Sequence, residues 1–553
     1  MKKSSKEIFF LSFVFLLGIL LRFYRLPSVP TGVFRDEAAF GYNAYSILTT
    51  GKDEYGKSFP LMFRSFGDYK MPVYTYLTVL SVRTWGLNVF STRFFSAFFG
   101  SLTVMVVFFL VTAIFSEKRF WLALLSAFIF AVSPWSIFFS RAAFEANVAL
   151  FFFLTAFLMQ IKAFEKGSKI FLFASAFIYS LSTYTYIVEK LLSPVFFLLF
   201  SIILAKKKSQ NAKIRPKIVL LSFFLFLIVS LPQFFILRFA AGNNRIESLS
   251  IIKAEDFAKV ESNPAQIFSV LRKPLSLYAA YFSSRNLFFE PDSDPQRSLP
   301  ELSVFYSWMV IPFFLGFYLL LAKEGDYSKK IILPFLFLVP VPAALTGDPF
   351  STLRALPLIF PLVILISLGI EKIYLVISNK RAAVPLISVF FLLSIAYLVR
   401  SIFFLLPEER YFEWNYGYEE LAEELKEFPG AKVLIDDPVG VSYIQMLFFN
   451  QYPPAKVQEE FNFDLSRYYQ MGDWKNQSKV GDFEARPLVW GKDNLEKDIL
   501  VARVVGISPA QIKIHSLTEL FAIIGPDRKI IFNAFITNRG IKQLGYGSSF
   551  ETP

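Results

Sequence analysis

Phe34-Arg35-Asp36-Glu37-Ala38-Ala39-Phe40-Gly41-Tyr42-Asn43-Ala44 follows the first apolar segment of the chain, just beyond Pro27 and Pro30. Two adjacent carboxylates at the end of a membrane span are costly unless the site is wet or uses their charge. The same loop closes on Phe66-Gly67-Asp68-Tyr69-Lys70-Met71-Pro72, which places a lysine just before a proline. This pattern predicts a reaction centre in the first loop of a membrane enzyme. The alternative is that Asp36 and Glu37 are first-turn acids of a helix, where the helix dipole favours them.

Composition places the chain in a membrane. Of its 553 residues 54% are hydrophobic, and they gather in runs of roughly twenty, the length of a membrane-spanning helix. Much of the Lys and Arg behind the net charge of +13 lies in short loops between these runs, which favours membrane orientation over nucleic-acid binding. The absence of Cys excludes disulfides and Cys-zinc sites, and the single His515 is expected to be structural. The sequence therefore predicts a mostly α-helical, polytopic membrane protein.

The basic loops give the predicted topology. Strong apolar runs lie at 8–26, 92–115, 120–139, 144–163, 169–187, 191–205, 217–237, 303–322, 331–346, 353–376 and 382–405. Loops rich in Lys and Arg follow every second run, at 118–119, 162–169, 206–217, 323–330 and 380–381, and such loops are normally cytoplasmic. The prediction is a plasma-membrane protein with eleven spans, a cytoplasmic N-terminus and an external C-terminus.

Two segments need separate treatment. The N-terminus has the basic start and the apolar run of a signal peptide but no small-residue cleavage site, which indicates an uncleaved first helix. A weaker apolar run at 72–86 leaves the span count inconsistent if it crosses, because only one span fits between the external first loop and the cytoplasmic Lys118. We therefore expect Val73–Trp85 to be a helix that lies on the outer face or inserts only partly.

The spans leave three large external regions, at 27–91, 238–302 and 406–553. The predicted division is a transmembrane domain at 1–405, which carries the first two regions as loops, and a C-terminal domain at 406–553. The tail is the right size for one soluble domain. Strand-like runs at 432–437, 499–505, 520–524 and 529–535 and a helix at 442–450 predict a small extracytoplasmic α/β fold.

The second external loop is unusually basic. It contains Arg238, Arg245, Arg272, Lys273, Arg285 and Arg297. External loops are normally poor in Lys and Arg, so a loop this basic predicts an anionic partner, by the logic of phosphate binding. Contact with anionic lipid headgroups is the alternative.

Polar residues also gather at the external ends of other spans. These segments are 133–135, 140–147, 184–190 and 347–354. Glu145 lies on the same predicted membrane face as Asp36, although it could simply pair with Arg141, four residues earlier on one helix face. Unrelated surface charges need not collect on one face, so their convergence there indicates a site.

These residue types suit group transfer from a lipid phosphate. A carboxylate can remove a proton from an acceptor hydroxyl or amine, and Lys and Arg can stabilise the departing lipid phosphate. The lipid tail of such a donor would reach the site from the bilayer.

On these residues the chain resembles the GT-C-type polytopic glycosyltransferases. It is similar to the dolichyl-phosphate-mannose protein mannosyltransferase family (glycosyltransferase family 39) and to the aminoarabinose transferases. The matching segments are Arg35-Asp36-Glu37, Tyr69-Lys70-Met71-Pro72, Ser140-Arg141 through Glu145, and Leu353-Arg354-Ala355-Leu356-Pro357. The resemblance extends over 1–405.

The resemblance implies a role for each matching residue. Asp36 would be the catalytic acid/base carboxylate with Glu37 beside it, and Glu145 stands where the family often has Asp in its second external loop. Lys70 would contact the polyprenyl phosphate. The further candidates for binding the donor phosphate are Arg245, Arg285, Arg297 and Arg354. Some family members use a divalent cation such as Mg²⁺ or Mn²⁺, for which Asp36 and Glu145 would be ligands.

The sequence thus predicts an integral membrane glycosyltransferase. It would move a hexose or pentose from a polyprenyl-phosphate donor to an acceptor protein, lipid or glycan on the outer face. The alternatives are a transporter or flippase of lipid-linked sugars, a polymerase or ligase, and a non-catalytic scaffold. A transporter would place charges near the bilayer midplane in broken helices with repeat symmetry, whereas here they lie at span ends. A scaffold would need neither the acidic pair nor the basic loop.

Overall fold

The chain divides into two compact units. The computed structural model describes residues 5–115, 119–206, 214–237, 251, 253, 255–256, 261, 263–322, 327–470, 478–503 and 506–545. Unit 1 comprises Met1–Leu26, Met71–Tyr74 and Phe94–Phe404. Unit 2 comprises Pro27–Lys70, Thr75–Arg93 and Leu405–Pro553. The tail that begins at the predicted boundary therefore shares a unit with most of the first external loop.

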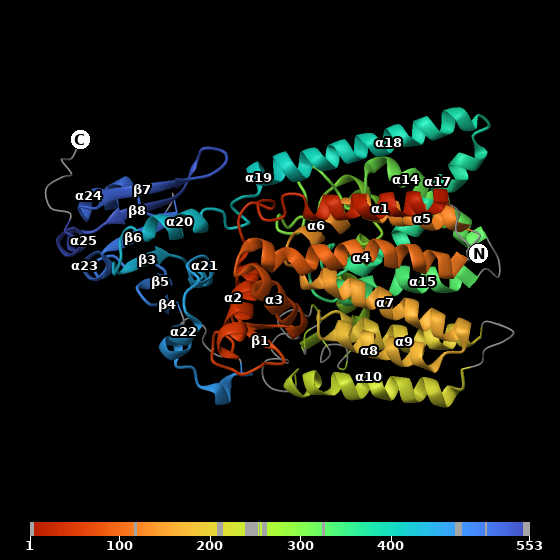
Figure 1. The fold of residues 1–553 in the computed structure, drawn as a ribbon, viewed down its shortest axis with the longest axis horizontal. Coiled ribbons are helices and arrows are strands. Elements are labelled where there is room, and N and C mark those ends of the chain that lie inside the picture. The colour runs from red at the N-terminus through yellow and green to blue at the C-terminus, as the bar shows by residue number, and fades with distance from the viewer. Residues whose placement is uncertain are drawn as a thin grey trace. The chain divides into compact units, whose positions relative to one another are not determined.

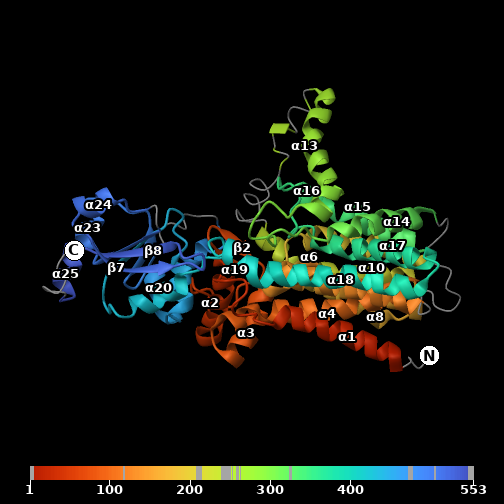
Figure 2. The ribbon, with the colours of Figure 1, turned by 90° about the horizontal axis from the view of Figure 1, so that it is seen from above.

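Unit 1 is helical, and its long helices run side by side (Figures 1 and 2). They are α1 (Ser5–Phe23), α4 (Val89–Phe115), α5 (Phe120–Val132), α6 (Pro134–Arg141), α7 (Glu145–Lys166), α8 (Lys169–Thr183), α9 (Glu189–Ala205), α10 (Pro216–Leu237), α14 (Val310–Ala322), α15 (Tyr327–Leu338), α17 (Ile359–Val376) and α18 (Lys380–Arg400). The shorter elements are α13 (Ile267–Ala280), α16 (Pro340–Ala344), the 3₁₀ helices η2 (Pro264–Gln266), η4 (Ser307–Met309) and η5 (Leu356–Leu358), and the π helices η3 (Arg285–Phe289) and η6 (Ser401–Leu405). Helix α13 projects away from the other helices of its unit (Figure 2).

The helices of unit 1 include several that are long and apolar enough to cross a membrane. Among the described residues six single helices qualify by length and composition, or seven if the bent pair α5 and α6 counts as one span. Each predicted apolar run is helical over at least part of its length. The mostly α-helical class is therefore confirmed, while the count of eleven spans stays a prediction.

Proline and glycine shape this helical unit. The Ser133-Pro134 step bends α5 against α6 by 52°, and the Ser133 hydroxyl accepts the Ser136 amide at 3.2 Å as the cap of the new helix. Helices α14 and α17 approach closely through Gly316 and Gly369. A Cβ atom on either glycine would lie within 2 Å of a carbonyl oxygen of the facing helix. Small residues thus allow the backbone contact that a membrane bundle uses in place of the hydrophobic effect.

Unit 2 combines the first loop with the tail. The loop contributes α2 (Arg35–Thr50), the hairpin β1 (Phe63–Ser65) and β2 (Asp68–Lys70), and α3 (Pro72–Trp85). The tail contributes α19 (Leu406–Glu409), α20 (Tyr418–Leu425), β3 (Val433–Asp436), α21 (Tyr443–Phe449), α22 (Pro454–Phe461), η7 (Leu465–Arg467), β4 (Lys479–Val480), β5 (Phe483–Arg486), α23 (Asp493–Glu496), β6 (Ile499–Arg503), α24 (Pro509–Ile514), β7 (Thr518–Ile524), β8 (Ile530–Ile536) and α25 (Asn538–Gln543). The expected helix at 73–85 is present as α3, and its placement at a membrane surface stays a prediction.

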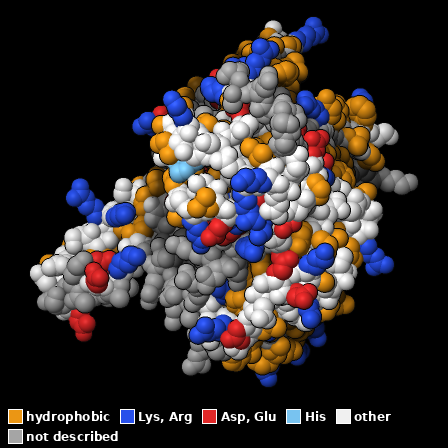
Figure 3. Space-filling view, turned by 90° about the vertical axis from the view of Figure 1, so that its left-hand side faces the viewer, with side chains coloured by type: hydrophobic (Ala, Val, Ile, Leu, Met, Phe, Trp, Pro, Cys, Tyr) orange, Lys and Arg blue, Asp and Glu red, His pale blue; other side chains and the backbone are white. Residues whose placement is uncertain are grey.

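The tail forms a mixed six-stranded sheet in the order β4-β5-β3-β6-β8-β7. Strand β3 runs parallel to β5 and β6, and the remaining pairs are antiparallel. The predicted strands correspond to β3, β6, β7 and β8, and the predicted helix corresponds to α21. On the face shown in Figure 3, acidic side chains lie beside basic ones. Ion pairs such as Arg486–Asp493 and Arg539–Asp498 join neighbouring elements of the tail.

One buried cluster joins the loop to the tail inside unit 2. Ala39 and Tyr42 of α2 pack with Leu447 and Phe448 of α21. A Cβ atom on Gly41 would lie 2.5 Å from the Phe448 ring, so this position of α2 must stay small. The separate C-terminal domain at 406–553 stays a prediction.

Candidate active site

Asp36 and Lys70 form an ion pair in unit 2. The Lys70 Nζ atom lies 2.8 Å from an Asp36 carboxylate oxygen, and the side chains are 14% and 40% exposed, respectively. Helix α2 begins at Arg35, so Asp36 does lie in a first helical turn, as the alternative interpretation requires. Helix-start stabilisation alone needs no lysine partner, whereas the structure brings the two sequence-predicted residues into contact. The pair is therefore the centre of the candidate site.

A hairpin places Lys70 at this position. Lys70 is the last residue of β2 and pairs with Phe63 of β1. The tail holds the hairpin: the Arg64 amide donates to the Tyr468 hydroxyl at 3.0 Å, and the Tyr69 hydroxyl donates to the Tyr468 carbonyl at 2.6 Å. The lysine ammonium also lies 5.3 Å from the centre of the Phe40 ring, within cation–π range. Residues far apart in the sequence thus fix the position of the Lys70 ammonium.

Glu37 has a different environment from Asp36. Its side chain is buried, and both of its oxygens accept from Arg93, each at 2.9 Å. One oxygen also accepts the Phe34 amide at 3.1 Å, which caps α2. Arg93 in turn donates to the Pro30 carbonyl at 2.9 Å and to the Gly32 carbonyl at 2.6 Å. This geometry gives Glu37 a part in positioning α2, and Asp36 is the more accessible carboxylate of the two.

Sequence reasoning missed Arg93. The residue stands at the start of the apolar run 92–115, where we treated it only as part of a span. A lone arginine near the end of an apolar run is a usable signal, because a buried charge requires a partner. The structure gives it Glu37 as its partner.

Glu145 belongs to unit 1. It is the first residue of α7 and is partly buried. Arg141, four residues before it, is buried and donates to main-chain carbonyls of Leu21 at 2.8 Å and Tyr24 at 2.8 Å. Arg141 thus binds the carbonyl end of α1, a stabilising position for a cation. The catalytic role of Glu145 stays a prediction.

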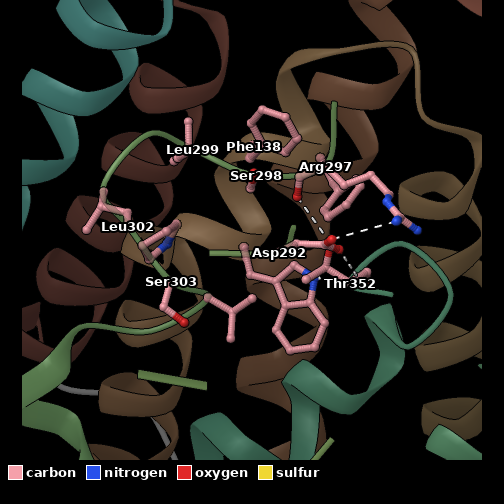
Figure 4. Close-up of a pocket in the computed structure, with 12 residues that line it drawn as sticks. Phe138, Asp292, Arg297, Ser298, Leu299, Leu302, Ser303 and Thr352 are labelled. Atoms are coloured by element: carbon pink, nitrogen blue, oxygen red, sulfur yellow. Dashed lines mark hydrogen bonds and ion pairs between the residues drawn. The ribbon is translucent and has the colours of Figure 1, made fainter. Parts of the chain in front are cut away.

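Arg297 and Arg354 meet at one carboxylate in unit 1. Arg297 lies 3.1 Å from Asp348 and 2.9 Å from Asp294, and Arg354 also forms an ion pair with Asp348. Asp292 completes the cluster: it accepts the Thr352 amide at 3.0 Å and lies 3.6 Å from Arg297 (Figure 4). Three carboxylates therefore surround two guanidinium groups, and a phosphate would have to share these cations with Asp348.

The cluster also contacts both 133–135 and 347–354, two of the segments that the sequence predicts to lie on one membrane face. The Trp135 indole donates to the Thr352 carbonyl at 3.1 Å. Burial raises the pKa of Asp292, although Arg297 beside it opposes this shift. A cavity of about 10 Å³, room for about one water molecule, borders Asp292 and Ser298 (Figure 4). The structure thus shows a compact polar junction here.

The remaining cationic candidates lie elsewhere. Arg285 begins η3, is exposed, and forms an ion pair with Glu290 at 2.6 Å. Arg245 lies outside the described residues. Both stay predictions as phosphate ligands.

Two further carboxylates are buried inside unit 2, and sequence reasoning assigned them no role. Asp53 accepts from the Tyr468 hydroxyl and from the Lys57 amide at 2.8 Å. Glu54 accepts from the Asn43 side chain at 3.1 Å and lies beside the Tyr443 hydroxyl. Burial raises the pKa of Asp53 to about 6 and that of Glu54 to about 8, and the more distant Lys70 lowers the latter only in part.

These raised pKa values predict that unit 2 loses stability as the pH rises. The folded form holds protons that the unfolded chain releases at lower pH, so the stabilisation is complete below the unfolded pKa and is lost towards the folded pKa. Within that window, the free energy of unfolding falls by about 1.4 kcal/mol for each such group with every unit by which the pH rises. The melting temperature of the full chain in detergent should therefore fall between about pH 5 and about pH 8.

Glu54→Gln tests whether the raised pKa of Glu54 causes this pH dependence. The glutamine amide oxygen can still accept the hydrogen bond from Asn43, but the side chain no longer titrates. We expect a flatter pH profile and a higher melting temperature on the alkaline side. Glu459→Gln, at an exposed position of α22, is the matched control and should leave the profile unchanged. A profile equally steep in Glu54→Gln would contradict the assignment.

Part of the sequence and the fold of the chain are similar to those of known proteins. The family model for dolichyl-phosphate-mannose-protein mannosyltransferase matches residues 12–241, a segment that contains Asp36, Lys70, Arg93 and Glu145. The structure of ArnT from Cupriavidus metallidurans bound to undecaprenyl phosphate has a TM-score of 0.51 and 12% identity over 95% of this chain and 97% of ArnT. Its apo state has a TM-score of 0.52 and 11% identity over the same shares.

A second relative by structure is the oligosaccharyltransferase of Archaeoglobus fulgidus. Its apo form has a TM-score of 0.50 and 12% identity over 91% of this chain and 70% of that protein. No curated protein sequence matches the chain. At these identities the structural likeness establishes the fold. The resemblance to GT-C-type glycosyltransferases, the mannosyltransferase family and the aminoarabinose transferases that the sequence predicted is confirmed.

Proposed function

We propose that the protein is an integral membrane glycosyltransferase that moves a sugar from a polyprenyl-phosphate donor to an acceptor on the outer face of the membrane. The observation that carries the proposal is the contact between Asp36 and Lys70 at the start of α2, within the segment that the mannosyltransferase family model matches. The ArnT structure with undecaprenyl phosphate, which shares the fold, supports a polyprenyl-phosphate donor. The basic loops support the outer-face orientation.

In the proposed reaction, Asp36 acts on the acceptor and Lys70 acts on the phosphate that leaves. The Asp36 carboxylate removes the proton from the acceptor hydroxyl or amine, whose heteroatom then bonds to the anomeric carbon of the sugar. The bond from that carbon to the phosphate oxygen breaks, and the polyprenyl phosphate leaves with the electron pair. Lys70 stabilises the negative charge of the leaving phosphate.

The ion pair suggests how donor binding prepares the base. A phosphate that binds Lys70 competes with Asp36 for the same ammonium, since both are anions. Asp36 would then be released towards the acceptor when the donor is in place. Further proposed ligands of the donor phosphate are Arg285, Arg297, Arg354 and Arg245. Of these, Arg297 and Arg354 would bind the phosphate while each also pairs with Asp348.

A divalent cation remains a proposal for this site. Asp36 belongs to unit 2 and Glu145 to unit 1, and the described residues contain no group of three or more His, Asp and Glu side chains arranged to hold a metal ion. Asp36 is paired with a lysine, a poor neighbour for a cation. The proposed chemistry therefore uses no metal ion.

Lys70→Met tests the proposed phosphate contact, because methionine keeps much of the stem and removes the charge. Binding of undecaprenyl phosphate to the purified full chain should weaken by about 1.5–3 kcal/mol, the size of one lost charge-assisted hydrogen bond. Lys52→Met, at an exposed position of the same loop, is the control and should bind normally. Unchanged affinity in Lys70→Met would leave Lys70 as a partner of Asp36 only.

A further inference from the structure

A cavity of about 230 Å³ lies at one end of the helices of unit 1. Its lining comes from the C-terminal parts of α4, α14 and α17, from Arg119 just before α5, and from Ser328 in the first turn of α15. In the sequence these helix ends adjoin the basic segments 118–119, 323–330 and 380–381, which predict the cytoplasmic side. The predicted topology therefore assigns the cavity to the cytoplasmic side.

Most of the cavity wall is apolar. Phe115 of α4, Leu320 of α14 and Leu368 of α17 all contribute to it. The cavity lies next in sequence to the glycine contact described above: Leu320 comes one turn after Gly316, and Glu371 comes two residues after Gly369. An apolar recess that ends beside charged residues has the composition of a site for an amphiphile.

The charges of the cavity favour an anion. Arg119 forms an ion pair with Glu371, and Lys372 adds a second cation. Lys372 is exposed and forms no ion pair with any residue in the described ranges. The two cations exceed the single carboxylate by one positive charge.

Two other lysines near the ends of these helices already donate to main-chain carbonyls. Lys329 donates to the Leu321 carbonyl at 3.0 Å, and Lys380 donates to the carbonyls of Leu375 at 3.0 Å and Ile377 at 2.8 Å. These lysines satisfy the carbonyl ends of α14 and α17. Lys372 thus differs from them, because its charge has no such assignment.

The rim of the cavity is apolar and exposed. Leu375, which lines the cavity, is 61% exposed, and Val376 beside it is 66% exposed. On a membrane protein such side chains are covered by lipid chains. A molecule with an anionic head and apolar chains would therefore satisfy the inner charges and the outer rim at once.

We propose that this cavity binds the phosphate headgroup of an anionic phospholipid of the cytoplasmic leaflet. Arg119 and Lys372 contact the phosphate, and the acyl chains run out along Leu375. Basic pockets between membrane helices on the cytoplasmic side are known to suit such headgroups. The proposal is independent of the glycosyltransferase function, since it uses neither Asp36 nor Lys70.

The test measures lipid binding to the delipidated full chain by native mass spectrometry. The probes are dioleoyl phosphatidylglycerol, dioleoyl phosphatidylcholine and glycerol phosphate. We expect phosphatidylglycerol to bind about fivefold more tightly than phosphatidylcholine, the contribution of one cation near a lipid phosphate. Lys372→Gln should abolish this preference. Lys330→Gln, which removes an exposed charge at the same end but outside the cavity, should retain it.

A second variant tests the contribution of the cavity volume apart from that of the Lys372 charge. Leu319→Trp fills the recess without changing any charge and should weaken phosphatidylglycerol binding, with a melting temperature matched to Lys330→Gln as the check on folding. Equal binding of the two phospholipids, or equal effects of Lys372→Gln and Lys330→Gln, would overturn the proposal. Binding of glycerol phosphate as tight as that of phosphatidylglycerol would indicate a site for a soluble phosphate and would also overturn it.

Discussion

Asp36→Asn is expected to reduce the rate of sugar transfer in membranes by about 10²–10⁴-fold, the usual contribution of a general base. Asparagine keeps the size of the side chain and its position at the start of α2, and it removes the ability to take a proton. Protein level and binding of the polyprenyl-phosphate donor should stay close to those of the parent chain. The measurement is transfer of labelled sugar from lipid-linked donor in membranes, with donor binding measured separately in detergent.

The control for Asp36→Asn is the same substitution at an exposed carboxylate. Asp482→Asn in the tail changes the net charge equally and should leave transfer unchanged. If Asp36→Asn keeps most of the transfer rate, Asp36 is a helix-start acid and the proposed mechanism loses its base. Loss of donor binding together with transfer would instead show that the Asp36–Lys70 pair is needed to build the phosphate site.

Arg93→Met should destabilise unit 2 by about 3–5 kcal/mol, because it leaves the Glu37 carboxylate buried without a partner. The same change removes the donors to the Pro30 and Gly32 carbonyls, which fix the approach to α2. We expect a lower melting temperature of the full chain, faster proteolysis of the first loop and a loss of transfer that follows from misplacement of Asp36.

The double variant Glu37→Gln with Arg93→Met distinguishes this explanation from a general loss of packing. Removing both charges is less costly than removing one, so the double variant should be more stable than Arg93→Met alone. Arg83→Met, at an exposed arginine of α3, serves as the control. A double variant that is less stable than Arg93→Met would show that Glu37 contributes chiefly through the cap of α2.

Local patterns predicted much of the fold. The apolar runs gave the helices of unit 1, and alternation with polar turns gave β3, β6, β7 and β8 of the tail. The short strands β4 and β5 were missed, because Phe483-Glu484-Ala485-Arg486 has neither the length nor the β-branched residues of a recognisable strand. The shared buried cluster of α2 and α21 could not be predicted either, since periodicity carries no information on contacts between distant segments.

The candidate site shows the same division. Asp36 and Lys70 could be singled out, because charges after a membrane span are informative by themselves. The distinct roles of Asp36 and Glu37 could not, since they depend on which carboxylate reaches Arg93 in three dimensions. Likewise the cluster at Asp348 needs two separate loops to meet before Arg297 and Arg354 can be recognised as partners of one acid.

The contact between the hairpin and Tyr468 sets an order of events during synthesis. The hairpin leaves the ribosome early, but its partner follows 404 residues after Arg64. At synthesis rates of ~5–20 residues per second this is a wait of about 20–80 seconds. Until the chain has been made as far as Tyr468, the strand that presents Lys70 lacks the groups that hold it. A chain truncated or stalled before Tyr468 would therefore contain Asp36 and Lys70 without the contacts that position the lysine.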